Sequence, residues 1–486
     1  MISRISNRSL DGILLIGLCA LLCIAQSPSG AAQAPDSNVK ILQPGVRVTQ
    51  LAQHPDLVTP TGIQIDESGN LWVVACHTHF RPATYQGPEN DEILVFDSQG
   101  KNRRVFYNKT KTTMQLLLGG DGWLYIAQRD RVLRVRDSDG DGVGDLEEPI
   151  ATLETLADYP HNGLSGMTWH TDGGLIFSLG ENFGKDWSLR GSDGGVLTGR
   201  GEGGVFHCTK QGRELRRIAK GFWNPFGLWM RDDGILFAAE NDPGSRPPCR
   251  LLHVVEGGDY GFQYVYGSAS VHPFVCWNGE LRGTLGMIHS SGEGPCAVVG
   301  LGGGVMVPSW SNHCIDYYPL RWQGATLVSD KIELLRGSDM FRPVAMVRKN
   351  DREYYFTDWV SPSYELHGLG RLWKLEIDPE QATWIQRERV PATPEAALAE
   401  RLRTGKGLTP QDQELPRLMA MIQGDDSFMK DAAQSALARI ASEWGEDKFR
   451  SLSSPERLWS LVALRKRSEE HTSELQSRQY LVCRLL

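Results

Sequence analysis

Pairs of short segments in which apolar and polar residues alternate recur along the chain. The two segments of each pair are joined by a short polar turn that contains glycine. Residues 60–75 read PTGIQIDESGNLWVVA, with a polar turn in the middle. Similar segments begin at Met114, Leu164, Pro225 and Arg342. A period of two predicts strands, and the glycine turn predicts that neighbouring strands are antiparallel. The chain therefore carries a repeated β-hairpin.

The spacing of these hairpins predicts the fold. Their turns are separated by steps of about 53, 51, 61 and 117 residues, and the last step is about twice the others. We therefore expect a further, degraded unit between Cys296 and Asp330. Six units of roughly 55 residues predict an all-β six-bladed propeller with four-stranded blades over residues 45–385. The alternative, a β-sandwich with repeated hairpins, rarely reaches this size as one unit.

The pattern changes toward both ends of the chain. Residues 391–466 have apolar positions at helical spacing, which predicts the start of an α-helical, HEAT-like repeat domain. Residues 467–486 resemble a translated sequencing adapter, so we interpret them as a non-native tail. At the other end, basic residues, an apolar run and a small-residue cleavage pattern predict a secretion signal over residues 1–34. A retained membrane anchor is the alternative, so the chain is expected to be exported, periplasmic or membrane-associated.

Composition and charge narrow the function classes. The chain has 53 glycines and 25 prolines among 486 residues, as expected for many tight turns. Its net charge of -8 argues against binding nucleic acid, which needs a cationic footprint. Outside the two predicted end segments lie six cysteines that an exported chain could pair, although spacing gives no connectivity. They are Cys76, Cys208, Cys249, Cys276, Cys296 and Cys314.

An acidic segment is the most specific local signal. Residues 137–148 fit a twelve-residue calcium loop, with Gly142 at the position of its sharp turn. Calcium prefers six to eight oxygen ligands, which this loop could supply from five carboxylates and one backbone carbonyl. A solvated acidic turn is the alternative. The predicted ligands are Asp137, Asp139, Asp141, Val143, Asp145 and Glu148.

Histidines supply a second candidate for chemistry. His77 and His79 follow the second strand of the first hairpin, and Arg81 comes shortly after. Two histidines spaced by two residues share one face of an extended segment, so they could bind a metal or carry protons. Structural roles are equally compatible with the pattern. The same ambiguity applies to His161, Arg342, Asp358 and His367.

Several ordered segments resemble a known family. HNGLSGMTW, GFWNPFGLW, GGDYGF, MVPSWSN and MFRPVAM, spread over residues 45–385, resemble the soluble quinoprotein glucose/sorbosone dehydrogenases. That family consists of six-bladed propellers that use pyrroloquinoline quinone (PQQ) and calcium. The HTHFRP and LHGLGRLWKL segments resemble proteins described as membrane-bound dehydrogenases in the Planctomycetes and Verrucomicrobia. Such proteins often continue into helical repeats and a c-type cytochrome.

The resemblance implies roles for individual residues. His161 matches the catalytic base, and Asn224 and Arg342 match positions that contact the cofactor. Asn241, Asp242 and Pro243 match the segment that holds calcium, while His77, His79 and Arg81 could add contacts to the quinone. Three cationic positions of the family are replaced, by Trp223, Ser311 and Met340. PQQ carries three carboxylates, so these replacements weaken the case for PQQ.

Three functions follow as hypotheses. The first is an exported quinoprotein-like oxidoreductase that acts on a sugar or alcohol and passes electrons to a c-type cytochrome. The second is a calcium-dependent, lactonase-like hydrolase that uses Glu240, Asn241 and Asp242 together with the channel histidines. The third is a non-catalytic propeller that binds partners or glycans. Detection of turnover, and its dependence on quinone, separates them.

Overall fold

The computed structural model describes residues 38–244, 248–263 and 276–470, and side chains only as far as Lys466 at the C-terminal end. The described residues all belong to one compact unit. The predicted signal segment, residues 1–34, and most of the predicted tail lie outside the described residues. No helix among the described residues is long and apolar enough to cross a membrane.

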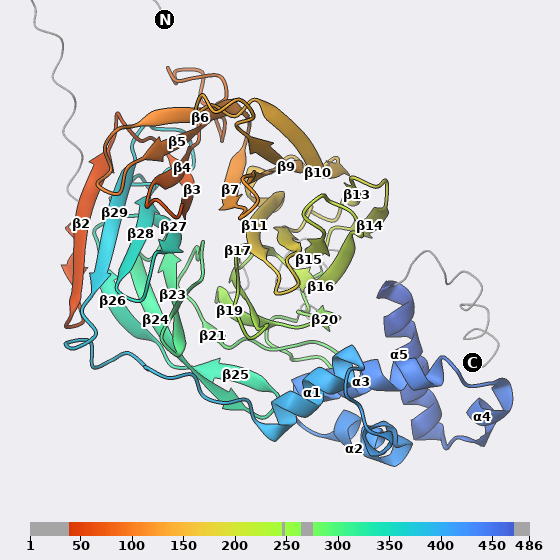
Figure 1. The fold of residues 1–486 in the computed structure, drawn as a ribbon. Coiled ribbons are helices and arrows are strands. Elements are labelled where there is room, and N and C mark those ends of the chain that lie inside the picture. The colour runs from red at the N-terminus through yellow and green to blue at the C-terminus, as the bar shows by residue number, and fades with distance from the viewer. Residues whose placement is uncertain (1–37, 245–247, 264–275, 471–486) are drawn as a thin grey trace, which may run out of the picture. The chain divides into compact units, whose positions relative to one another are not determined.

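The described strands form six sheets arranged around a central axis (Figure 1). The first sheet contains, from the axis outward, β3 (Pro60–Ile65), β4 (Leu71–Ala75), β5 (Asp91–Phe96) and β6 (Arg104–Thr110). The second contains β7 (Thr113–Leu118), β8 (Leu124–Gln128), β9 (Arg131–Arg136), β10 (Leu146–Thr155), β13 (Asp186–Gly191) and β14 (Val196–Arg200). The third contains β11 (Leu164–Trp169), β12 (Leu175–Leu179), β15 (Gly203–Cys208), β16 (Arg216–Phe222) and β20 (Gly258–Asp259).

The remaining three sheets complete the ring. The fourth contains β17 (Asn224–Met230), β18 (Leu236–Asn241), β19 (Arg250–Val254) and β21 (His289–Ser290). The fifth contains β22 (Val299–Leu301), β23 (Gly304–Ser309), β24 (Cys314–Gln323), β25 (Thr326–Ser329), β26 (Ile332–Arg336) and β1 (Lys40–Ile41). The sixth contains β27 (Pro343–Arg348), β28 (Glu353–Asp358), β29 (Arg371–Ile377) and β2 (Val46–Gln53).

This arrangement confirms the predicted six-bladed propeller, including a blade in the gap after Cys296. The ring is closed because β2, which precedes the first blade, pairs along its length with β29, the last strand of the sixth. The prediction of four strands in every blade is wrong for three of them. The hairpin β13–β14, for example, leaves the connection between β12 and β15 and extends the second sheet through β10.

Apolar layers lie between neighbouring blades. Along β4, Leu71, Val73 and Ala75 pack toward the sixth sheet, whereas Val74 packs toward the second. Side chains on a strand alternate between its faces, so a blade buried on both faces needs apolar residues at consecutive positions. Repeated six times, this packing holds the inner strands side by side and places the loops at their ends around one opening.

Helices follow the last blade. They are α1 (Pro394–Thr404), α2 (Leu415–Gln423), α3 (Ser427–Ala441), α4 (Glu446–Ser451) and α5 (Ser454–Glu470). Asp426 caps α3 by accepting hydrogen bonds from Phe428 N and Met429 N, and it also accepts one from Ala325 N in the fifth sheet. Apolar residues of α1, α2, α3 and α5 join the core layer between the third and fourth sheets. The helices are thus packed against the propeller; their HEAT-like character stays a prediction.

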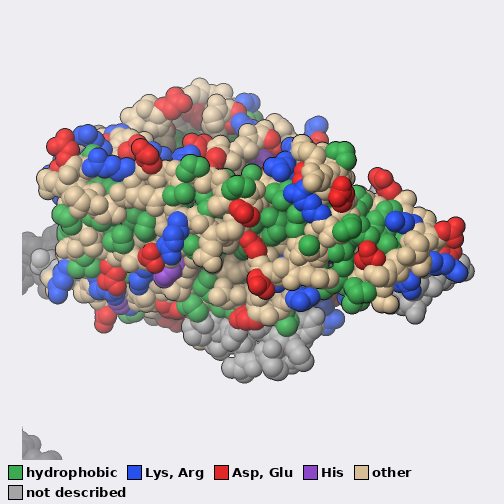
Figure 2. Space-filling view, turned by 90° about the horizontal axis from the view of Figure 1, so that it is seen from below, with side chains coloured by type: hydrophobic (Ala, Val, Ile, Leu, Met, Phe, Trp, Pro, Cys, Tyr) green, Lys and Arg blue, Asp and Glu red, His purple; other side chains and the backbone are tan. Residues whose placement is uncertain are grey.

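Charged side chains of both signs are interspersed with apolar ones on the face drawn in Figure 2. This face shows no broad basic surface of the kind that binds a phosphate backbone. The five cysteines Cys76, Cys208, Cys249, Cys296 and Cys314 hold free thiols, so the pairing considered for them is not formed.

Candidate functional site

A cavity of about 350 Å³ lies where the inner strands begin, and all six blades contribute to its wall. This volume lies within the range of small-molecule sites, roughly 300–1,000 Å³. Thr61, Met114 and Val344 come from three inner strands. The other lining residues are His79, Tyr159, His161, Asn162, Phe183, Trp223, Asn224, Phe226, Asn241, Asp242, Pro243, Gly244, Glu293, Gly294, Cys296, Trp310, Ser311, Trp359 and Tyr364.

Two histidines meet at this cavity although they are 82 positions apart in the chain. Nε2 of His79 lies 2.6 Å from Nε2 of His161, and Nδ1 of His79 lies 3.0 Å from the carbonyl oxygen of Tyr364. A carbonyl only accepts, so Nδ1 of His79 carries the proton in that bond. Nε2 of His79 then accepts a hydrogen bond from Nε2–H of His161. In this tautomer, Nδ1 of His161 keeps its lone pair.

The surroundings keep both histidines neutral. Burial lowers the pKa of His79 to about 4, and burial together with His79 lowers the pKa of His161 to about 3. The ring centres of Tyr159 and Tyr364 lie 5.4 and 4.9 Å from that of His161. At neutral pH, His161 is therefore a neutral imidazole that can accept a proton.

Local backbone geometry places His161 and Asn162 at the wall. They belong to the short 3-10 turn Pro160–Asn162, which precedes β11 and begins with a proline. Gly163 follows, and a Cβ on Gly163 would lie only 2.3 Å from the carbonyl oxygen of Arg129. Glycine is therefore required for the close approach of this turn to its neighbour.

Two buried amide oxygens at the cavity wall are unsatisfied. Oδ1 of Asn162 and Oδ1 of Asn224 are buried and have no hydrogen-bond partner among the described residues. The amide nitrogen of Asn162 donates to the carbonyl oxygen of Glu181 at 2.7 Å, which fixes the direction of its oxygen. Buried polar atoms are nearly always paired in native proteins, so a ligand hydroxyl is a fitting partner for both.

A buried ion pair between Glu240 and Arg250 holds the backbone next to Asn224. Oε1 of Glu240 accepts a hydrogen bond from Trp223 N at 2.6 Å, and Oε2 lies 2.5 Å from an Arg250 guanidinium nitrogen. Both charged side chains are fully buried, and the guanidinium lies 3.6 Å from the Trp277 ring centre. Glu240 therefore holds the start of β17. It does not line the cavity, which contradicts its place in the hydrolase hypothesis.

An acidic cluster forms another part of the wall. Sγ of Cys249 lies 3.6 Å from Oδ2 of Asp242 and 3.4 Å from Oε2 of Glu293. Burial raises the pKa of Glu293, and the charge of Asp242 raises it further. Sequence reasoning selected Asp242 but missed Glu293 and Cys249. Their only sequence signal was proximity to glycines and prolines of loops, which does not indicate which side chains meet.

The structure brings some predicted residues together and separates others. His79, His161, Asn224, Asn241, Asp242 and Pro243 line the cavity, as do the replaced positions Trp223 and Ser311. Met340 does not; its carbonyl oxygen accepts a hydrogen bond from Arg371.

Arg342 lies behind the wall. Its guanidinium is 4.5 Å from the Trp310 ring centre, and it donates to the carbonyl oxygens of Asp339 and Trp310, each at 3.1 Å. These bonds direct the charge toward loop backbone. The described cavity wall does not include Arg342, although it includes Trp310, which packs against the guanidinium.

The shared face expected for His77 and His79 is wrong. The segment after β4 bends instead of continuing as a strand, so the two rings diverge. Nδ1 of His77 lies 2.8 Å from the Tyr85 hydroxyl, and its Nε2 is 3.5 Å from Glu92. Arg81 donates to the carbonyl oxygens of His77 and Gly87 at 2.9 and 2.8 Å. His77 and Arg81 therefore stabilise their own loop and do not line the cavity.

The predicted calcium loop gathers only part of its ligand set. Ligand atoms of Asp137, Asp139 and Asp141 lie within 4.8 Å of one another. Asp145 instead accepts a hydrogen bond from Ser138 N at 2.7 Å. Glu148, at the twelfth position, lies in β10 and pairs with Arg134 at 2.5 Å. The twelve-residue coordination pattern is therefore wrong at its last position, because the β9–β10 hairpin carries Glu148 away from the loop.

The electrostatic balance of the cavity is negative. Among the described residues that line it, two are carboxylic acids and none is lysine or arginine. Burying a charged group without a partner costs several kcal/mol, so the described wall favours neutral or cationic ligands over anions.

Comparison with known proteins gives the fold relationship. Residues 36–260 match a family described as a domain of unknown function, DUF7133. No curated protein is significantly similar in sequence. Among solved structures, a protein from Thermus thermophilus described as an oxidoreductase (glucose dehydrogenase) is similar, with a TM-score of 0.51 and 17% identity over 68% of this chain and 100% of the other.

Two further solved structures have the same architecture. The PQQ-bound aldose sugar dehydrogenase from Streptomyces coelicolor has a TM-score of 0.50 and 14% identity, over 71% of this chain and all of the other. A calcium-containing carbohydrate-active enzyme of family AA12 from Trichoderma reesei has a TM-score of 0.50 and 12% identity, over 71% of this chain and 98% of the other. The chain therefore has the six-bladed propeller fold found in PQQ-dependent sugar dehydrogenases.

Proposed function

We propose that the central cavity binds a neutral polyhydroxylated compound, a sugar or related alcohol, and that the protein oxidises it. The observation that carries this proposal is the contact between Nε2 of His79 and Nε2 of His161 on a wall that also holds unsatisfied amide oxygens. The sugar substrates named for the structural neighbours support the same ligand class.

His161 is the proposed proton acceptor. Its Nε2–H is directed to His79, which in turn donates to the carbonyl oxygen of Tyr364, so the free lone pair is on Nδ1. A substrate hydroxyl presented to Nδ1 would transfer its proton there, while the hydride on the same carbon passes to a two-electron acceptor of the uncharged quinone or dye type that binds beside the substrate. Oδ1 of Asn162 and Oδ1 of Asn224 would accept hydrogen bonds from other hydroxyl groups and so orient the substrate.

A calcium ion fits the acidic part of the wall. The carboxylates of Asp242 and Glu293 are hard oxygen donors, and their mutual repulsion would be relieved by a divalent cation. The amide nitrogen of Asn241 donates to the carbonyl oxygen of Pro295, which leaves its oxygen available as a further donor. When bound, calcium would polarise a nearby hydroxyl and favour its ionised form.

PQQ does not fit the described wall. Its three carboxylates need cationic partners, whereas the described lining residues include two acids and neither lysine nor arginine. The guanidinium of Arg342 is directed to loop carbonyls behind Trp310. We therefore assign no step to PQQ, and we expect the electron acceptor to be a different oxidant.

Export and electron transfer to a c-type cytochrome are further parts of the proposal. They are supported by the signal-like pattern of residues 1–34 and by the resemblance of the chain to dehydrogenases that continue into a cytochrome. Mass spectrometry of the mature N-terminus in an exported fraction would test the first, and reduction of a purified c-type cytochrome by the protein and its sugar would test the second.

The described cavity wall contains no lysine or arginine. This favours a second candidate, a propeller that binds a neutral glycan without turnover. Binding of neutral sugars measured by calorimetry, together with reduction of an artificial electron-accepting dye with and without PQQ and calcium, distinguishes the two. Oxidation predicts dye reduction that depends on calcium and not on PQQ. Binding without dye reduction under every condition would instead establish the glycan-binding role.

Two variants test the assignment of residues. His161→Gln removes the proton acceptor, so we expect dye reduction to fall by roughly 10²- to 10⁴-fold with little change in sugar affinity. His289→Gln is the matched control, because His289 lies in β21 and does not line the cavity. Full activity of the His161→Gln protein would overturn the assignment. Asn224→Ala should weaken sugar binding, and failure of the wild type to bind any neutral sugar would overturn the proposed function itself.

A further inference from the structure

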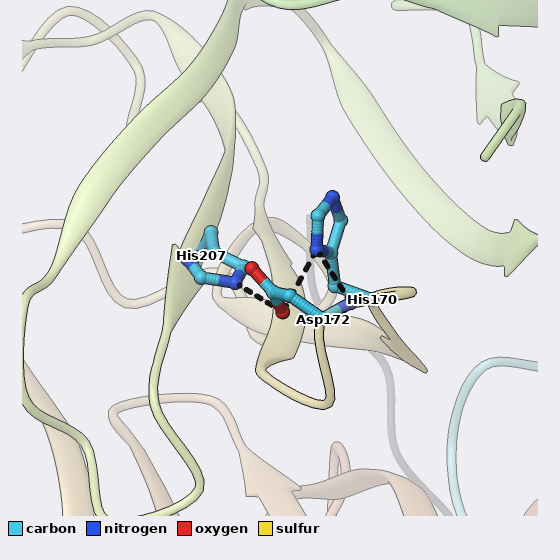
Figure 3. Close-up of side chains that lie close together, drawn as sticks. All are labelled: His170, Asp172 and His207. Carbon is cyan, nitrogen blue, oxygen red and sulfur yellow. Dashed lines mark hydrogen bonds and ion pairs between the residues drawn. The ribbon is translucent and has the colours of Figure 1, made fainter.

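A further group of side chains of the types that bind metal ions lies at the opposite end of the third blade from the cavity. His170 and Asp172 belong to the turn that joins β11 to β12, and His207 lies in β15, which pairs with β12 (Figure 3). The cavity residues His161 and Asn162 precede β11, so the strand separates the two places by on the order of 20 Å. The group is therefore independent of the proposed function.

The three side chains converge on one oxygen atom. Oδ1 of Asp172 lies 2.8 Å from Nδ1 of His170 and 3.2 Å from Nε2 of His207. Figure 3 shows both rings directed at the same carboxylate, and the ring centres are 5.0 Å apart. One ligand atom from each residue lies within 4.8 Å of the others. Each nitrogen faces a carboxylate oxygen, and a proton or a cation between them would relieve the repulsion of their lone pairs. Nδ1 of His170 also accepts a hydrogen bond from Asp172 N at 3.3 Å.

We propose that His170, Asp172 and His207 bind one divalent transition-metal ion of the zinc type. Two imidazole nitrogens and one carboxylate oxygen are the donors that zinc and its neighbours prefer, whereas calcium and magnesium need more oxygen ligands. Tetrahedral zinc with bonds of about 2.0–2.1 Å places its ligand atoms about 3.3 Å apart. The observed 2.8 and 3.2 Å are close to this spacing, so small movements of the two rings suffice.

Exposure and charge also suit a bound ion. His207 is buried, His170 is partly exposed, and the side chain of Asp172 is 51% exposed. Two protein nitrogens and one oxygen leave a fourth tetrahedral position, and the exposed side of Asp172 gives water or another small ligand access to it. The carboxylate offsets half of the ion's charge. Arg216 of β16 lies opposite His207 of β15, and its positive charge is paired with Glu256 at 2.5 Å.

A backbone hydrogen bond fixes the position of the Asp172 carboxylate. Gly174 N donates to Oδ1 of Asp172 at 2.8 Å, which fixes the carboxylate beside β15. A Cβ on residue 174 would lie 2.3 Å from Nε2 of His207, so glycine at this position keeps the nitrogen accessible. The metal would cross-link the β11–β12 turn to β15, which is the strand that pairs with β12.

Zinc binding by the untagged full-length protein tests this inference. Equilibrium dialysis against Zn²⁺, with metal content measured by mass spectrometry, should detect one ion that is lost in Asp172→Asn and His170→Ala. Loss of a residue that only hydrogen-bonds to a metal ligand typically lowers metal affinity by roughly 10- to 100-fold. Loss of a direct ligand should lower the zinc affinity at least as much. Both substituted side chains are partly or largely exposed, so these variants are expected to fold.

Matched controls separate this site from the other acidic groups. Cys249→Ser changes the cavity cluster and Asp139→Asn changes the loop after β9, and both should retain the ion. Co²⁺ gives an independent readout, because tetrahedral coordination by nitrogen and oxygen produces visible absorption bands that Asp172→Asn should abolish. Retention of the zinc ion by both Asp172→Asn and His170→Ala would overturn the proposal, and so would loss of that ion in Cys249→Ser alone.

Discussion

Replacing Glu181 by glutamine should change the stability of the protein in a pH-dependent way, in favour of the variant as the pH rises. Glu181 lies in the loop after β12, next to the cavity residue Phe183, and its side chain is fully buried. Burial raises the pKa of its carboxyl group to about 7, although Gly184 N and Phe183 N donate hydrogen bonds to it at 3.0 and 2.5 Å. The nearby charge of Glu202 also raises this pKa.

The sign of the effect follows from proton binding. In the unfolded chain, Glu181 has the ordinary pKa of 4.5. Between pH 4.5 and pH 7 the unfolded state has lost this proton while the folded state keeps it, so stability falls as the pH rises. A difference of about 2.5 pKa units corresponds to a loss of stability of about 3 kcal/mol, which is absent below about pH 4.5 and fully developed above about pH 7.

Glutamine cannot ionise. Phe183 N and Gly184 N donate to different carboxylate oxygens of Glu181, so the single amide oxygen of glutamine can accept only one of these hydrogen bonds, and the loss of the other lowers stability by about 1–3 kcal/mol at every pH. The difference in unfolding free energy between Glu181→Gln and the wild type should therefore shift in favour of the variant by up to about 3 kcal/mol between pH 4.5 and pH 8, on top of the constant cost of the lost hydrogen bond. Urea unfolding followed by tryptophan fluorescence at a series of pH values measures the difference. Glu256→Gln, which alters an exposed ion pair, is the control and should change stability by at most about 1 kcal/mol. A difference between Glu181→Gln and the wild type that does not vary with pH would refute the reasoning.

Three other predictions concern the scaffold. Arg250→Met leaves Glu240 buried without its cation, so urea unfolding should show a loss of about 3–5 kcal/mol, and adding Glu240→Gln should restore most of it; a single variant as stable as the wild type would contradict the buried pair. Glu148→Gln should leave calcium affinity measured by calorimetry unchanged, because Glu148 binds Arg134 outside the acidic loop; a large drop would return it to the ligand set. Leu437→Ala should lower stability by about 2–5 kcal/mol in thermal unfolding, because Leu437 is fully buried in α3 at the contact with the blades; no change would exclude a packed interface there.

The local patterns that predicted the blades are reliable for a physical reason. Alternation and turn residues act between neighbours in the chain, and the hairpin predicted at residues 60–75 forms as β3 and β4. The period of the repeat then indicates how many blades close the ring. The site was also predicted in part, since the resemblance selected His161, Asn224 and Asp242, which do line one cavity.

The predictions that the structure contradicts share a different cause. The prediction for His77 and His79 assumed an extended segment, but the backbone bends after β4 and the two rings diverge. Arg342 was assigned to a ligand by position alone, yet its guanidinium is directed to loop carbonyls behind Trp310. A side chain's direction depends on loop conformation and on neighbours from other blades, and neither is encoded at nearby positions.

The amino-acid sequence by itself determined a ring of β-hairpin units followed by helices, because strand alternation, turns and helical spacing are short-range properties. Only the tertiary structure decided which polar groups meet: His79 with His161, Asp242 with Cys249 and Glu293, and His170 and Asp172 with His207. These contacts join segments from different strands and blades. Their geometry is set by how the sheets pack: His79 and His161 come from different blades, and His207 meets Asp172 only through the pairing of β12 with β15.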